Sequence, residues 1–194
     1  MRRRTFDALV TGAGLILAAI LIVAGGLLAW GHSFVGSQVH NQLAAQKIYF
    51  PAGNSPAIKA PEFAAMHQYA GQLMTTGAQA EVYADHFIAN HLKEIGGGLT
   101  YSQLSAKSLA QPKNAALAAQ VQLMFRGTTL RGMLLNAYAF WEIGQIALLG
   151  AIAAFAGAGL LLILSVLGFV HLRRVSPATE VLPSLSSGEP VTVA

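Results

Sequence analysis

The clearest pattern of hydrophobic and polar positions is a pair of uncharged apolar runs, at residues 8–30 and 146–170. As α-helices that rise about 1.5 Å per residue, they would extend about 35 Å and about 37 Å, whereas the hydrocarbon core of a bilayer is about 30 Å thick. Each run is therefore long enough to cross a membrane with some tilt. We predict transmembrane helices over residues 8–30 and 143–170.

The segment between the predicted spans, residues 31–142, has a helical rhythm of apolar positions and no strictly alternating run of the kind that a half-buried strand requires. The first helix is expected to continue beyond Trp30, because Val35, Val39 and Leu43 keep a spacing of four residues. The predicted fold class is an all-α membrane protein, with two transmembrane helices and an extracytoplasmic helical-bundle domain between them.

Turn and cap signals divide this segment into further helices. Four are expected: one from Pro61 to an end or bend at Gly77, one over 78–95 closed by the glycines of 96–98, a short one opened by a Thr100–Gln103 capping box, and a long one from Asn114 into the second span.

Basic residues flank both predicted spans. Positively charged flanks resist translocation, so both termini are expected in the cytoplasm, with 1–7 as a basic N-terminus and 171–194 as a disordered tail. Aromatic residues near the outer ends of the spans are typical of an interfacial belt. The predicted membrane-interface anchors are Arg2, Arg3, Arg4, Trp30, Trp141, Arg173 and Arg174.

Composition agrees with a membrane chain and narrows the partners. Only 10% of the 194 residues are charged, compared with about 25% in soluble domains. The net charge of +4 is not gathered on one soluble face, so lipid headgroups are the expected partner of the basic flanks and no nucleic-acid binding is expected. A cleaved signal peptide would also begin with arginines, but its apolar core is only about 7–15 residues long. An uncleaved anchor is the preferred interpretation.

Ionisable side chains crowd the helix predicted over 78–95, and the weak metal-ligand candidates there are Glu81, Asp85, His86 and His91. His86 and His91 are five residues apart, about 140° around a helix, whereas two ligands on one face need a spacing of three or four. We therefore expect a hydrogen-bonded polar face, with no metal, cofactor or catalytic residue. A histidine that senses pH is the alternative.

Small residues recur at a spacing of four in both predicted spans, and such rows let helices approach closely. The candidate helix-packing residues are Gly14, Ala18, Gly150, Ala154 and Ala158. A chain rich in alanine, with 20 glycines, also produces such rows by chance. Pairing of the two spans within one chain is the least demanding use of them, and homo-oligomerisation comes next.

Two segments, AEVYADHFIANHLKEIGGGLTYSQ at 80–103 and RGMLLNAYAFWEIGQIALL at 131–149, resemble a family of uncharacterised two-span membrane proteins of high-GC Gram-positive bacteria. The resemblance runs from the first span through the second. It implies a bacterial plasma-membrane location, and it carries over no activity and no site residues.

These patterns favour a non-enzymatic accessory or scaffold subunit that binds a membrane or envelope protein, or a second copy of itself, through the exported helical domain. The alternative is a sensory or ligand-binding input unit that relays a signal through its spans to a partner. A sensor should enclose a cavity lined by polar groups such as His67, His91 or Asp85, whereas a scaffold should expose an apolar patch. An enzyme would need a cleft with paired titratable groups.

Overall fold

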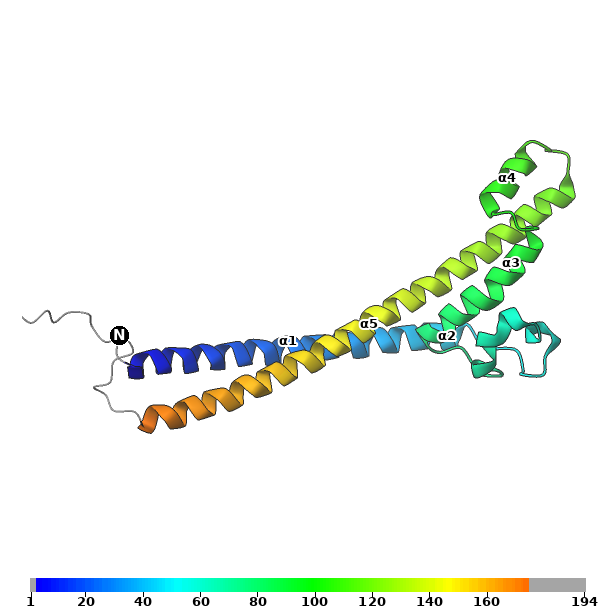
Figure 1. The fold of residues 1–194 in the computed structure, drawn as a ribbon. Helices are drawn as coiled ribbons and strands as arrows, with labels where there is room; N and C mark the ends of the chain where they lie inside the picture. The colour runs from blue at the N-terminus through cyan, green and yellow to red at the C-terminus, as the bar shows by residue number, and fades with distance from the viewer. Residues whose placement is uncertain (1–2, 175–194) are drawn as a thin grey trace, which may run out of the picture. The chain divides into compact units, whose positions relative to one another are not determined.

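The computed structural model describes residues 3–174, and within that range the regular structure is helical (Figure 1). The elements are α1 (Arg3–Ala45), the 3₁₀ helices η1 (Pro56–Ile58) and η2 (Pro61–Tyr69), α2 (Gly77–Val82), the π-helical turn η3 (Tyr83–Ile88), α3 (Ala89–Ile95), α4 (Tyr101–Leu109) and α5 (Ala115–Arg174). The described part of the chain has no strand, only an isolated bridge between Tyr49 and Leu73. The predicted all-helical class is therefore confirmed over the described residues. Arg2 and most of the predicted tail, residues 175–194, lie outside them.

The chain forms two compact units. Unit 1 combines Met1–Ala29 with Leu149–Ala194, and so contains the first part of α1 and the last part of α5. Unit 2 is Trp30–Leu148, and it contains the rest of α1 and α5 together with all the short helices. Residues 8–29 of the first predicted span and residues 149–170 of the second therefore lie in unit 1.

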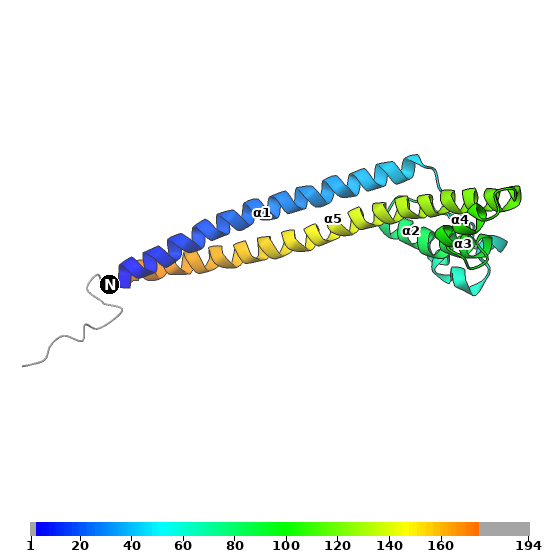
Figure 2. The ribbon, with the colours of Figure 1, turned by 90° about the horizontal axis from the view of Figure 1, so that it is seen from above.

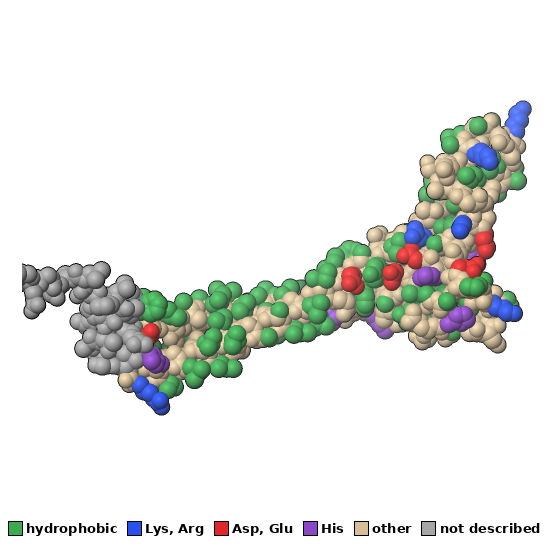
Figure 3. Space-filling model, viewed as in Figure 1, with side chains coloured by type: hydrophobic (Ala, Val, Ile, Leu, Met, Phe, Trp, Pro, Cys, Tyr) green, Lys and Arg blue, Asp and Glu red, His purple; other side chains and the backbone are tan. Residues whose placement is uncertain are grey.

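In unit 1 the two helices lie side by side and antiparallel (Figures 1 and 2). Both α1 and α5 are long and apolar enough to cross a membrane, and only 17% of the most apolar window of each is buried within the chain. A core helix of a soluble protein would bury most of such a window. Hydrophobic side chains instead cover the visible face of this unit along most of its length (Figure 3).

Unit 2 has its own hydrophobic core, which lies between the short helices and the parts of α1 and α5 that belong to this unit. Its most completely buried large side chains are Phe50, Ile58, Met66 and Met74. Phe50 makes an edge contact with Tyr83 at 5.3 Å between ring centroids, which joins the loop after α1 to the π-helical turn. A second, smaller cluster of Leu104, Val121 and Met124 holds α4 against α5.

The prediction of a helix from Pro61 to Gly77 is wrong about where this helix ends. It is a 3₁₀ helix that ends at Tyr69, and Gly71 then takes a positive φ of 73°. Gly77 instead begins α2, where the Thr76 side chain accepts a hydrogen bond from the Gln79 backbone N–H and Gln79 Oε1 accepts one from the Thr76 backbone N–H. The TTGAQ segment is therefore a capping box that starts a helix.

The other predicted boundaries agree with the structure. A single helical path, α2–η3–α3, covers the segment predicted over 78–95, and Gly97 and Gly98 after it have positive φ. The Thr100–Gln103 capping box opens α4. Asn114 Oδ1 accepts the Leu117 N–H at 3.0 Å and so caps α5.

A candidate binding groove between α1 and α5

Unit 2 has a groove between α1 and α5, with a volume of about 560 Å³, that could hold another molecule. Eight lining residues come from α1 and the residues just after it, and six come from α5. They are Phe34, Val35, Gln38, Val39, Gln42, Leu43, Gln46 and Ile48, and Leu130, Met133, Leu134, Asn136, Ala137 and Phe140.

The groove has a buried floor and exposed rims. Val39, Leu43 and Leu134 on the floor are 7%, 5% and 3% exposed and also belong to the core of unit 2. On the rims, Met133 is 63% exposed and Phe140 is 60% exposed. Large apolar side chains that stay this exposed beside an open groove are typical of a surface that binds a partner or ligand.

The groove carries no ionisable side chain among its lining residues. Its polar members are all amides: Gln38, Gln42 and Gln46 follow one another at a spacing of four along α1, and Asn136 lies on α5. Residues four apart share one helix face, so the glutamines form a neutral row along one rim. A charged group placed in this groove would lose hydration without gaining an opposite charge, so the groove favours neutral, apolar molecules.

One end of the groove is aromatic. Phe34 stacks on Trp30 with ring centroids 5.5 Å apart, and Trp30 is the residue predicted to mark the outer end of the first span. Close to this end, His32 Nδ1 donates a hydrogen bond to the Gly144 carbonyl oxygen at 2.9 Å. Val35 packs on Gly144, where an added Cβ would lie 3.6 Å from Val35 Cγ1. These contacts hold α1 and α5 together beside the groove.

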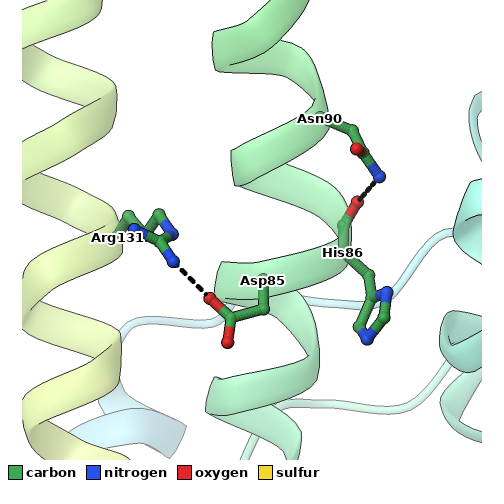
Figure 4. Close-up of polar contacts among 4 residues, drawn as sticks. All are labelled: Asp85, His86, Asn90 and Arg131. Atoms are coloured by element: carbon green, nitrogen blue, oxygen red, sulfur yellow. Dashed lines mark hydrogen bonds and ion pairs between the residues drawn. The ribbon is translucent and has the colours of Figure 1, made fainter. Parts of the chain in front are cut away.

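The predicted metal-ligand candidates do not converge on one another. Asp85 Oδ1 accepts a hydrogen bond from Arg131 Nη2 at 2.6 Å, and the His86 carbonyl oxygen accepts one from Asn90 (Figure 4). Within residues 3–174 there is no group of three or more His, Asp or Glu side chains placed to hold a metal ion. Of the four candidates, Asp85 pairs with α5 through Arg131, and the His91 side chain makes a local hydrogen bond.

Arg131 lies on α5 and forms an ion pair with a residue of another element. It pairs with Asp85, 46 positions away in the sequence, and so ties the π-helical turn to α5. The remaining candidate Glu81 acts on a different neighbour: together with Glu142 it raises the pKa of Tyr138, because the negative carboxylates disfavour a phenolate beside them.

His91 lies in an aromatic cluster and not in a polar site. Its Nδ1 donates a hydrogen bond to the Phe87 carbonyl oxygen at 2.7 Å, and its ring is 4.4 Å from the Phe87 ring and 5.8 Å from the Phe63 ring. His91 is therefore a partly buried histidine whose side chain is hydrogen-bonded within its own helical path. In the same cluster, burial raises the pKa of Tyr83.

The candidate helix-packing residues lie in unit 1, several of them where α1 meets α5. Ala18 is fully buried and Ala158 is 2% exposed, whereas Ala154 is only partly buried. A Cβ at Gly14 would lie 2.9 Å from Ser165 Oγ, and one at Gly150 would lie 3.2 Å from Leu28 Cδ1. Thus Gly14 and Gly150 adjoin side chains of the opposite helix within this chain.

The predicted interface anchors have different surroundings. Trp30 is 65% exposed, and Arg173 and Arg174 are exposed at the end of α5. Trp141, in contrast, is partly buried against the core of unit 2. No local pattern marks this contact, because the partner of Trp141 is Gly77, a residue that has no side chain.

Comparison with known proteins found no matching family model, no matching curated protein and no matching solved structure.

The sequence analysis does not predict the groove. Its floor residues Val39, Leu43 and Leu134 resemble any helical core stripe, and only the exposed apolar rim residues could have signalled a binding surface.

Proposed function

We propose that the chain is a two-pass integral membrane protein that acts as a non-enzymatic accessory or scaffold subunit, binding another component of the membrane or envelope through the groove of unit 2. The observation that carries the proposal is the groove: it is open, apolar and uncharged, and its rim residues Met133 and Phe140 are more than half exposed. His67, His91 and Asp85, which would have lined a polar sensory cavity, do not line it.

A second candidate function is the ligand-binding input unit. The groove volume of about 560 Å³ favours it, because small-molecule sites typically measure about 300–1,000 Å³. In that function, a ligand between α1 and α5 would change their packing in unit 2. Both functions use the same groove, and they differ in whether the occupant is a macromolecule. The input unit also needs a partner for its output.

The proposed location is a bacterial plasma membrane, with both termini in the cytoplasm and unit 2 on the opposite side. Support comes from the two long apolar helices and from the arginines beside both predicted spans. Reporter fusions after Arg4, at Asn54 and after Pro190 test it. A reporter that requires the cytoplasm should be active at the first and last positions only, and activity at Asn54 would overturn the proposed sidedness.

Partner binding is tested by purification of the full chain from native membranes in a mild detergent, followed by identification of what co-purifies. The informative variant is Met133→Glu, which places a charge on the groove rim. The matched control is Leu123→Glu, a half-exposed position on the same helix outside the groove. A partner that binds the groove should be lost from the first variant and kept by the second. Equal recovery with both variants would show that the groove is not the binding surface.

A further inference from the structure

We propose that the groove between α1 and α5 holds a single acyl chain of a membrane phospholipid. This inference rests on the second candidate function, since it takes the groove as the site of a ligand that is not a macromolecule and places unit 2 at the outer face of a membrane. It names the chemistry of the occupant, which the proposed function leaves open.

The lining of the groove is uncharged. The fourteen lining residues include no Asp, Glu, Lys, Arg or His, so the groove offers nothing to hold a phosphate, an amine or a charged side chain. Its floor of Val39, Leu43 and Leu134 offers only hydrocarbon. A methylene chain is the occupant that loses least by leaving water for such a surface.

The length of the groove matches the length of one acyl chain. From Phe34 to Gln46 the α1 wall rises about 18 Å, and from Leu130 to Phe140 the α5 wall rises about 15 Å, at 1.5 Å per residue. One leaflet of a bilayer core is about 15 Å thick, half of the total of about 30 Å, so one acyl chain spans the length of the groove.

The aromatic end of the groove is a suitable entrance for an acyl chain. The aromatic end of the groove includes Phe34, which stacks on Trp30, the residue predicted to mark the outer surface of the bilayer. Aromatic side chains with an apolar body prefer this level of a membrane. An acyl chain could therefore enter at Phe34 and Phe140 and extend toward Leu43, while its headgroup stays at the membrane surface.

Photocrosslinking in membranes of the producing cell tests the inference. The crosslinking amino acid p-benzoylphenylalanine is placed in the full chain at Met133, in the groove, and in two control chains at Ile143 and Leu123. All three positions lie on α5, are at least half exposed and differ in whether they line the groove. The mass of each irradiated protein identifies the captured molecule.

Ile143 is the first residue of the predicted span, whereas Met133 precedes the span by ten residues, so lipid that merely surrounds the protein should label Ile143 more. A groove-bound acyl chain should give the opposite order, with several-fold more phospholipid adduct at Met133 than at either control. A polypeptide adduct at Met133, from a partner or a second copy, without phospholipid would overturn the acyl-chain inference and leave the proposed function standing. Phospholipid at Met133 no greater than at Ile143 would also overturn the inference. No adduct of any kind above the Leu123 level would overturn both.

Discussion

Gly77 lies directly against Trp141: a Cβ atom added at position 77 would lie 2.6 Å from Trp141 Cγ, well inside van der Waals contact. Gly77 is the first residue of α2, and Trp141 belongs to α5 in the same unit. The start of the helical path α2–η3–α3 thus packs closely onto α5, and this close approach is possible because residue 77 has no side chain. The same path is tied to α5 further along by the Asp85–Arg131 ion pair.

Replacement of Gly77 should therefore destabilise unit 2. Gly77→Ala forces Trp141 or α2 to move, and such overpacking typically costs about 1–3 kcal/mol. The matched control is Gly132→Ala in α5, where an added Cβ meets nothing within 4 Å, so it should be neutral or stabilising by up to about 1 kcal/mol. Thermal unfolding of the detergent-solubilised protein, followed by circular dichroism, measures both. Equal stability of the two variants would contradict the close packing.

The helix pair of unit 1 predicts a specific disulfide. The chain has no cysteine, and a Cβ at Gly168 would lie 3.6 Å from Thr11 Cβ, within the range of about 3.5–4.5 Å that disulfides use. The Thr11→Cys/Gly168→Cys variant should form an intrachain bond on mild oxidation and migrate faster in gel electrophoresis without reductant. In the control pair, Gly12→Cys/Gly159→Cys, each added Cβ meets nothing within 4 Å. A bond between copies instead would argue against this helix pairing.

The Asp85–Arg131 pair should contribute little to stability by itself. The Arg131 Nη2–Asp85 Oδ1 distance is 2.6 Å, but the side chains are 40% and 38% exposed for Asp85 and Arg131. Exposed pairs typically contribute about 0.2–1 kcal/mol. A double-mutant cycle with Asp85→Asn and Arg131→Gln should give a coupling energy in this range that falls as salt is added. A salt-independent coupling of several kcal/mol would indicate a pair shielded from solvent.

Tyr138 should titrate above its ordinary range. The carboxylates of Glu81 and Glu142 raise its pKa, so the folded state holds the phenol proton more tightly than the unfolded state. This contribution to stability is complete below the unfolded pKa of 10.0 and is lost as pH rises through the folded pKa. Ultraviolet difference titration against Tyr138→Phe isolates this tyrosine. Glu81→Gln should shift its transition to lower pH, and an unchanged transition would show that Glu81 is not its main neighbour.

Much of the fold followed from local signals. Caps act over three or four residues, so Thr100, Gln103 and Asn114 were enough to place the starts of α4 and α5. Gly77 by itself predicts the end or a bend of a helix, because glycine commonly terminates helices. The neighbouring capping box of Thr76 and Gln79 decided otherwise.

The candidate site was much less predictable than the helices. The same stripe of Val39 and Leu43 that predicts a helix face serves at once as core and as groove floor. Nothing local distinguishes the two uses, because burial depends on the distance between α1 and α5 at that level. Likewise, the partner of Arg131 could not be read from its neighbours, since Asp85 lies 46 positions away.

The sequence by itself determined the helical class, two helices long and apolar enough to cross a membrane, and most helix boundaries, because hydrophobic periodicity and caps are properties of short segments. Only the tertiary structure decided which residues meet: Gly77 with Trp141, Asp85 with Arg131, and the two walls of an uncharged groove. Such contacts depend on the packing of residues far apart in the chain, and that packing is fixed by the shape and volume of all the side chains together.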